Sequence, residues 1–271
     1  MSINVIWWNA DGRGSWSCCH MLNEMFDLYV CTHNLVNDDG AVIVIHGQLP
    51  CRPLDWVERL PWVIWVVIGD EASESDYTVK HPNSRLWLQT PLPSQRADRY
   101  LIEGYPIHTK QSKEERSLLW FFAGQDNHQR RHDCVKALRE MEGGLMLTTH
   151  SFGAGIPQDQ YLKYMSRALV IPCPSGPATA DSFRIWEALE CGAVPIIDAR
   201  SLRDETVGFW SVVLGDHPLP IIEDWETLPE VMLAVLRDYP RISRLTQFWW
   251  LKYKLSFRSW LARDLISLGA R

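Results

Sequence analysis

Residues 167–198 read RALVIPCPSGPATADSFRIWEALECGAVPIID, and this stretch decides the fold. Its apolar run ALVI is typical of a buried parallel strand, and the proline- and glycine-rich segment from Pro172 onward is expected to be loop. Asp181 or Ser182 can cap the helix that follows, Gly192 can end it, and the run AVPII is expected to form the next strand. The order strand, loop, helix, strand predicts a βαβ unit of a parallel α/β sheet.

The expected helix carries two charged residues that suit a nucleotide. It begins at the carboxyl end of a parallel strand, where its free N–H groups favour an anion. Arg184 falls in its first turn, where a guanidinium can bind phosphate. Glu187 lies one turn later on the same face, and its carboxylate can accept both hydroxyl groups of a ribose. The pair therefore predicts a nucleotide-diphosphate site, and the alternative is that Glu187 is a surface acid paired with Arg184.

Three stretches resemble GT-B glycosyltransferases, most closely the exostosin-like family. They are WFFAG at 120–124 followed by Arg130 and Arg131, YLKYMSRALVIPCP at 161–174, and DSFRIWEAL at 181–189 followed by GAVP. The resemblance covers residues 117–225 and implies a donor-binding domain that takes a nucleotide-sugar, with a UDP-sugar as co-substrate. It also implies that a C-terminal helix crosses back onto the first domain.

The resemblance and the strand ends together select the donor contacts. We expect them to be Gly124, Arg130, Arg131, Ser175, Gly176, Ser182, Arg184 and Glu187. Arg130 or Arg131 can reach the diphosphate, and one of the two is expected to face solvent. Ser175 and Gly176 lie in the loop that can contact the base or the sugar. Ser182 can donate to phosphate, or it can simply cap the helix.

The first part of the chain is expected to hold a second doubly wound parallel sheet. Apolar strand-like runs alternate there with helical stretches and lie at residues 4–8, 41–45, 62–68 and 85–88. The segment 103–115 is polar and rich in turn-forming residues. We therefore expect two Rossmann-like domains facing a cleft, residues 1–110 on the acceptor side and residues 111–271 with the donor site and terminal helices.

An inverting transfer needs a base that takes the proton of the acceptor hydroxyl while the diphosphate leaves. Ligands of such sheets bind at the carboxyl ends of the strands, so the candidates are acids and histidines that directly follow a strand of the first domain. Asp70 or Glu71 is the first candidate, Asp11 the second and His46 the third. Each could instead belong to an ordinary turn or helix cap.

The sequence also bears on metals. The chain contains no Asp-x-Asp motif, so we expect arginines and a helix N-terminus to neutralise the diphosphate without a metal ion. His128 and His132 are four residues apart with no cysteine pair, and we expect them to be solvated or near phosphate rather than zinc ligands. No cofactor besides the co-substrate is expected.

Charge is unevenly distributed and bears on the acceptor. The chain has a net charge of −6, but residues 231–271 hold eight basic and two acidic side chains interleaved with aromatic ones. This stretch could be a packed amphipathic helix or a contact surface for an anionic polymer. No run is long enough to span a membrane, and seven scattered cysteines favour a reducing cytoplasm, that of a host cell if a phage encodes the chain.

These features favour an intracellular acceptor. We favour a 5-hydroxymethylpyrimidine in DNA, as modified by bacteriophage glucosyltransferases, since such a base can be flipped into a cleft. The alternatives are a glycan or cell-surface polysaccharide acceptor, and a catalytically inactive module that binds a nucleotide-sugar or a glycan.

Overall fold

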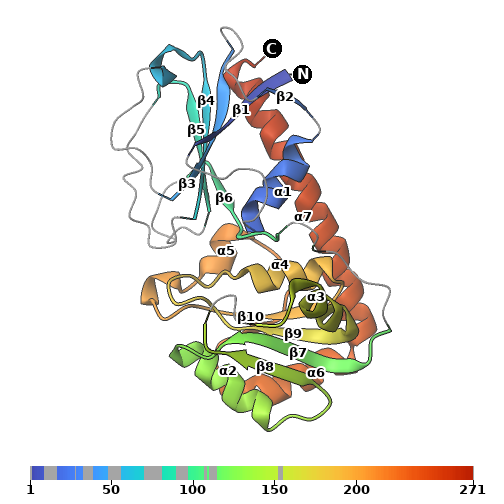
Figure 1. Cartoon of the computed structure of the whole chain (residues 1–271). Helices are drawn as coiled ribbons and strands as arrows, with labels where there is room; N and C mark the ends of the chain where they lie inside the picture. Colours follow the sequence, from blue (N-terminus) through green and yellow to red (C-terminus); the bar gives the residue numbers. More distant parts are fainter. Residues whose placement is uncertain are drawn as a thin grey trace. The chain divides into compact units, whose positions relative to one another are not determined.

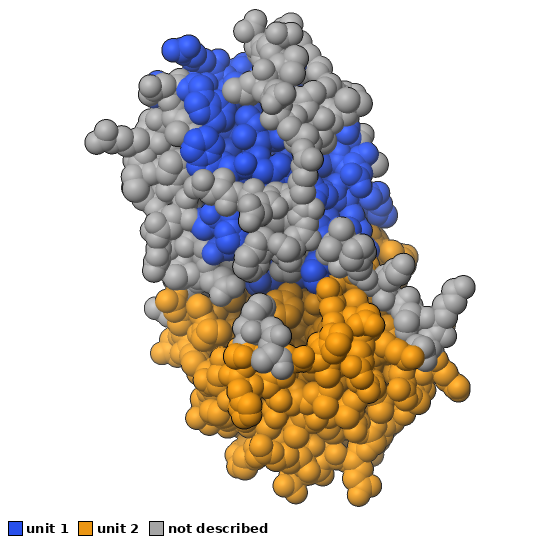
Figure 2. All heavy atoms as spheres, in the orientation of Figure 1, with its two compact units in different colours: residues 1–107, 253–271 blue, residues 108–252 orange. Residues whose placement is uncertain are grey.

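The computed structural model describes residues 2–8, 17–27, 29–32, 39–47, 56–69, 81–89, 97–106, 109, 115–151 and 155–270. The chain divides into two compact units, which Figure 2 colours separately. Unit 1 comprises Met1–Ile107 together with Tyr253–Arg271, and unit 2 comprises His108–Lys252. Each unit contains a parallel sheet and helices, which confirms the predicted α/β class.

Unit 1 is built on a six-stranded sheet in which every neighbouring pair is parallel (Figure 1). Its strands, in spatial order, are β2 (Val30–Thr32), β1 (Ser2–Trp8), β3 (Ala41–His46), β4 (Val63–Ile68), β5 (Ser84–Gln89) and β6 (Arg99–Leu101). Helix α1 (Ser17–Phe26) and the short 3₁₀ helix η1 (Val57–Arg59) complete the described elements before residue 107. The four strands expected here are confirmed, and the two that were missed have three residues each, too few to show a hydrophobic period.

Unit 2 contains a five-stranded parallel sheet. Its strands, in spatial order, are β11 (Ile221–Ile222), β10 (Val194–Asp198), β9 (Ala168–Cys173), β7 (Leu118–Gln125) and β8 (Leu145–Thr149). Its helices are α2 (Gln129–Arg139), α3 (Gln158–Arg167), α4 (Phe183–Glu190), α5 (Phe209–Val213) and α6 (Leu228–Arg237), with 3₁₀ helices η2 (Asp204–Thr206) and η3 (Trp225–Thr227). The stretch that decides the fold thus becomes β9, α4 and β10, as expected.

The C-terminal end of α4 follows a local rule, whereas the end of β9 does not. Gly192 adopts a left-handed φ of 74° just after α4, and Ala193 N–H donates to Ala188 O over 2.9 Å, which ends the helix. The expectation that Pro172 ends β9 is wrong, because the strand runs on to Cys173 and Pro172 pairs with Ile196 of β10. The register of β9 with β7 stops at Val170, so Pro172 lies where β9 pairs on one side only and its missing N–H is tolerated.

Helix α7 (Tyr239–Leu268) supplies residues to both units. In unit 2, Trp250 stacks on Trp186 with ring centroids 5.4 Å apart and donates to Glu190 over 2.6 Å. In unit 1, buried Asp264 accepts from the Trp87 indole over 2.9 Å and pairs with Arg99 at 3.2 Å. Trp250, Tyr253 and Phe257 of the basic stretch are buried in the core, whereas Phe248 is exposed.

A buried carboxylate, Asp198 at the end of β10, joins four segments of unit 2. It accepts hydrogen bonds from Arg130 Nε of α2 at 3.1 Å, from the backbone N–H of Ser175 after β9 at 3.1 Å, and from Trp225 of η3 at 3.0 Å. Its carbonyl accepts from the indole of Trp210 in α5 over 2.7 Å. A buried charge with this many donors is fully satisfied, and removing it leaves a buried guanidinium without its partner.

Asp198→Ala should therefore lower the free energy of unfolding by about 3–5 kcal/mol, the cost of breaking a buried ion pair. Asp238→Ala is the matched control, because Asp238 pairs with Arg241 at the surface and should cost less than about 1 kcal/mol. Urea denaturation of both variants tests this. Equal losses in the two variants would contradict it.

Candidate functional site

Arg184 is a buried cation with unused hydrogen-bond donors. It lies in the first turn of α4 and is only 4% exposed. Its Nη2 donates to the carbonyl of Ala123 over 2.9 Å, and its guanidinium lies 5.0 Å from the centroid of the Phe122 ring. Its Nε and Nη1 are buried without a hydrogen-bond partner. A buried charge with free donors is costly, which indicates that an anionic ligand belongs there.

Glu187 lies one turn further along α4 and is also 4% exposed. Burial raises its pKa to about 7, although a hydrogen bond from Tyr161 and the charge of Arg184 act in the opposite direction. The Tyr161 hydroxyl donates to Oε2 over 2.8 Å, and no ion pair within 4 Å joins Glu187 to Arg184. The alternative that Glu187 is a surface acid paired with Arg184 is therefore wrong. A buried carboxylate of this kind is typical of a binding site.

Gly124 makes room for the arginine. A Cβ at this position, near the end of β7, would overlap Nη2 of Arg184. The sequence predicted that Gly124 allows backbone approach to a ligand. In the structure, the lack of a side chain at Gly124 lets the Arg184 guanidinium approach the end of β7.

The adjacent arginines at the start of α2 have different partners. Arg130 is held by Asp198 and also donates to the carbonyl of Glu223 over 3.0 Å. Arg131 donates from Nε to the carbonyl of Ser175 over 3.3 Å, and burial followed by the charge of Arg184 lowers its pKa to about 10. Both residues are of intermediate exposure, and both guanidinium groups have hydrogen-bond partners within unit 2. Arg131 is thus the arginine of the pair that lies near Arg184, while Arg130 braces the fold.

The remaining expected donor contacts lie around α4. Ser175 is fully buried and its hydroxyl has no hydrogen-bond partner. Ser182 occupies the N-cap position of α4, but its side chain makes no capping hydrogen bond, so its hydroxyl is not committed to the helix. A Cβ on Gly176 would make only ordinary contacts, the nearest at 3.5 Å to Thr179 O, so packing of the described residues does not require glycine there.

Asp198 and Tyr161 were missed by the sequence analysis. Asp198 ends the quoted stretch directly after a strand, and the rule that strand ends carry function could have selected it. No sequence pattern identified Tyr161 as a site residue, because only the folded structure brings α3 against α4. Asp181 accepts from the Ser182 N–H over 2.7 Å and from the Trp186 indole over 2.8 Å, and it thereby fixes the entry to α4.

The candidate bases Asp11, Asp70 and Glu71 lie outside the described residues. His46 is described, and it ends β3 as expected. Its Nε2 lies 2.7 Å from the position that a Cβ on Gly69 would occupy, so the ends of β3 and β4 adjoin. Gly69, at the end of β4, also donates its N–H to Gln89 over 2.9 Å.

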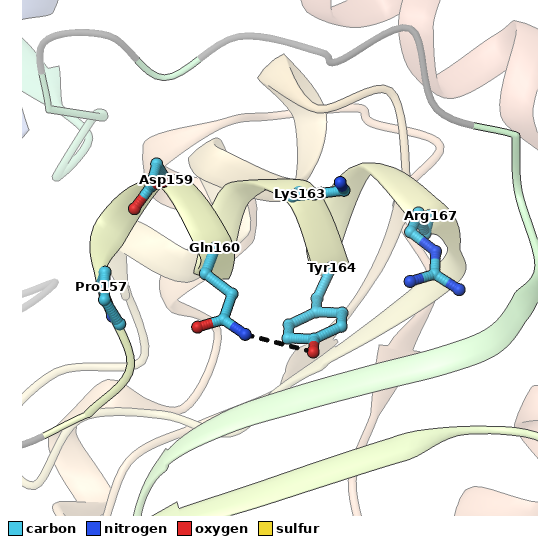
Figure 3. A pocket seen from close by; sticks show the side chains of 6 residues that line it. All are labelled: Pro157, Asp159, Gln160, Lys163, Tyr164 and Arg167. Atoms are coloured by element: carbon cyan, nitrogen blue, oxygen red, sulfur yellow. Dashed lines mark hydrogen bonds between the residues drawn. The ribbon is translucent and has the colours of Figure 1, made fainter.

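A separate pocket of about 390 Å³ lies on the surface of α3 (Figure 3). It is lined by Pro157, Asp159, Gln160, Lys163, Tyr164 and Arg167. Gln160 donates to the Tyr164 hydroxyl over 3.3 Å, and both side chains line the pocket. None of the expected site residues lines it, and its mixed charges favour no particular ligand.

Two negative findings apply to the described part of the chain. No group of three or more His, Cys, Asp or Glu side chains is placed to hold a metal ion there. None of its helices combines the length and the hydrophobicity that a bilayer-spanning segment needs.

No family model matches this sequence, and no curated protein matches it. Solved structures do match. The crystal structure of the DNA modifying enzyme beta-glucosyltransferase, studied with and without its substrate uridine diphosphoglucose, aligns over 99% of both chains with a TM-score of 0.53 and 11% identity. Anabaena HepE in complex with UDP aligns over 98% of this chain and all of its own with a TM-score of 0.50 and 11% identity. T4 phage BGT in complex with UDP and Mn²⁺ aligns over 99% of this chain and all of its own with a TM-score of 0.49 and 10% identity.

The first two similarities define the class of fold. The chain has the GT-B fold, which confirms the predicted class of fold and the resemblance at that level. At this sequence identity the comparison establishes the fold and leaves the activity to be argued from the site.

Glu187→Gln should stabilise the protein at alkaline pH. The ordinary pKa of 4.5 is raised to about 7 in the folded state, so the unfolded state ionises first and stability falls as the pH rises from 4.5 to 7. The amide removes this penalty and can still accept from Tyr161. At pH 8 the variant should gain on the order of 2–3 kcal/mol in free energy of unfolding, and near pH 4 nothing.

Urea denaturation at both pH values measures the effect. Glu226→Gln is the control, because Glu226 is exposed and should show no difference at either pH. A variant at Glu187 that is less stable than the parent at pH 8 would contradict the electrostatic account.

Proposed function

We propose that the protein is a glycosyltransferase that transfers a sugar from a nucleotide-diphosphate sugar, a UDP-hexose, to a hydroxyl group. The observation that carries the proposal is the buried Arg184 with two free donors, one helical turn from the buried Glu187. Both residues lie on the helix that follows β9, at the carboxyl edge where α/β sheets bind ligands. Two proteins of the same fold have been studied with UDP-glucose or UDP, which supports the choice of donor.

In this proposal the cations of unit 2 bind the diphosphate. Arg184 offers Nε and Nη1, and Arg131 adds a second guanidinium beside it. The Ser182 hydroxyl and the N–H groups at the start of α4 supply further donors. As the bond between the anomeric carbon and the phosphate oxygen breaks, negative charge grows on the leaving diphosphate, and these groups stabilise it.

The other contacts orient the nucleotide. Glu187 accepts from the ribose hydroxyls as a carboxylate, while Tyr161 holds one of its oxygens in place. The loop of Ser175 and Gly176 contacts the base or the sugar. Arg130 has a structural role, because its guanidinium donates to Asp198.

Arg184→Ala and Glu187→Ala should each weaken binding of UDP-glucose by about 1.5–3 kcal/mol, the value of a hydrogen bond to a charged group. Isothermal titration calorimetry measures the affinity, and circular dichroism checks the fold. Arg167→Ala is the matched control, since this arginine of α3 donates to Ser117 and lies outside the expected site. A folded variant of Arg184 with unchanged affinity would remove that residue from the site.

For the acceptor we propose a 5-hydroxymethylpyrimidine in DNA. The beta-glucosyltransferase of the same fold is described as a DNA modifying enzyme, and this chain has exposed cations on its C-terminal helices. They are Arg237, Arg241, Arg244, Lys252 and Arg263. Lys254 instead lies over the Tyr105 ring and Arg258 reaches the carbonyl of Glu24, so these two are partly engaged within unit 1. Buried unpaired thiols, such as Cys134, suit the cytoplasm that this acceptor requires.

Neutralising Arg244, Lys252 and Arg263 together as glutamines should weaken binding of hydroxymethylated DNA and leave UDP-glucose binding intact. The log–log salt dependence should flatten by about one unit for each phosphate group that the variant no longer neutralises. Lys136→Gln is the control, as this lysine is an exposed cation of α2. A parent protein that shows no salt-dependent DNA binding would overturn the DNA acceptor and favour a glycan. Absence of transfer to either acceptor, with donor binding intact, would identify an inactive binding module.

We further propose an inverting, metal-independent transfer in which Asp70, Glu71 or Asp11 is the base. Changing each of the three to its amide should abolish transfer in one case without loss of UDP-glucose binding. Transfer should also survive EDTA, because the arginines supply the positive charge. Activity that EDTA removes and Mn²⁺ or Mg²⁺ restores would contradict the second claim, and three active variants would contradict the first.

A further inference from the structure

Buried polar atoms without hydrogen-bond partners occur at the start of α2, in the loop after β9 and in the first turn of α4. They are Nδ1 and Nε2 of His128, Oγ of Ser175, and Nε and Nη1 of Arg184. His128 is the N-cap residue of α2, four residues after Gly124, and its side chain makes no capping bond. Arg131, three residues further on, reaches the carbonyl of Ser175, so α2 and the loop after β9 meet here. Buried polar atoms are normally satisfied, so this group indicates a missing polar ligand.

The surroundings of His128 favour its neutral form. Burial and then the charge of Arg131 lower its pKa to about 4, with a smaller contribution from His132 in the same direction. The backbone of Ser175 and the Asp198 carboxylate act the other way. The Ser175 backbone lies beside the ring, but neither ring nitrogen makes a hydrogen bond of acceptable geometry. Burial and the charge of Arg131 thus outweigh the Asp198 carboxylate and favour the neutral imidazole.

We propose that His128 contacts the diphosphate group of the donor and takes up a proton from solvent as that group binds. This inference rests on the proposed function. A diphosphate placed between Arg131 and Arg184 would reverse the local charge that disfavours the imidazolium. The protonated ring can then donate to a phosphate oxygen from a nitrogen that has no partner in the free protein.

The proton matters most for the leaving group. Free UDP carries more negative charge than the UDP-sugar, so a charged His128 stabilises the product side of the transfer. A rise in pH would return the ring to its neutral form and weaken the hold on UDP. His128 would thus link nucleotide affinity to pH at the donor site.

The test is calorimetric titration of UDP-glucose in two buffers that differ in ionisation enthalpy, at several values between about pH 6 and pH 8. UDP-glucose is the probe because the terminal phosphate of UDP itself titrates near pH 6. Glu187, with its pKa of about 7, also titrates in this range. The informative quantity is therefore the difference between the parent and His128→Asn, which keeps a neutral polar side chain but cannot take up the proton.

We expect the parent to take up more protons than His128→Asn, with a difference approaching about one per bound ligand at the acidic end. The affinity gap should reach about tenfold near pH 6 and shrink towards pH 8. His132→Asn is the control and should resemble the parent, because His132 is exposed and pairs with Asp126. Histidine ring NMR of the parent should show one ring becoming protonated on addition of UDP-glucose, in a signal that His128→Asn lacks.

Equal proton uptake and equal affinity in the parent and His128→Asn would overturn this inference and leave the proposed function intact. A His128 ring signal that stays neutral in the complex would overturn it even if the variant failed to fold. Absence of UDP-glucose binding by the folded parent would overturn both.

Discussion

The site in unit 2 depends on the buried carboxylate of Asp198. Its bonds to Arg130, Ser175 and Trp225 hold α2, the loop after β9 and η3 at the end of β10. Successive residues of a helix point about 100° apart. When Asp198 fixes Arg130, it therefore also fixes the direction of Arg131, whose guanidinium bonds to the Ser175 carbonyl. A single ion pair thus helps to position part of the proposed donor site.

The groups assigned to the donor are costly for the free protein. Arg184 is buried with free donors, Glu187 is buried with a raised pKa, and His128 and Ser175 have polar atoms without partners. Each condition opposes folding, because a buried polar group loses its bonds to water. A ligand that forms hydrogen bonds with these groups would bind only the folded state. Its binding would raise the free energy of unfolding by mass action. Such costs are expected where binding, rather than stability, determines the residue types.

Local patterns predicted β9, α4 and β10 of unit 2 and the longer strands of unit 1. The β9–α4–β10 order followed from apolar runs, a polar N-terminus and Gly192, which are all short-range signals. Predictions failed where contacts between residues distant in the sequence determine the local structure. Pro172 is tolerated in β9 because that part of the strand pairs on one side only. Glu187 is buried because α3 brings Tyr161 onto α4, and no spacing in the sequence encodes that contact.

The sequence by itself determined the α/β class of fold and placed Arg184 and Glu187 one turn apart on a single helix, because hydrophobic period, helix ends and a one-turn spacing are properties of neighbouring residues. The GT-B class was implied by the resemblance to a known family. The tertiary structure decided which of two adjacent arginines braces the fold and which lies beside Arg184. It also decided that the end of α7 belongs to unit 1, where Asp264 meets Trp87 and Arg99. These outcomes depend on burial and on partners far apart in the chain, and both exist only once the chain has folded.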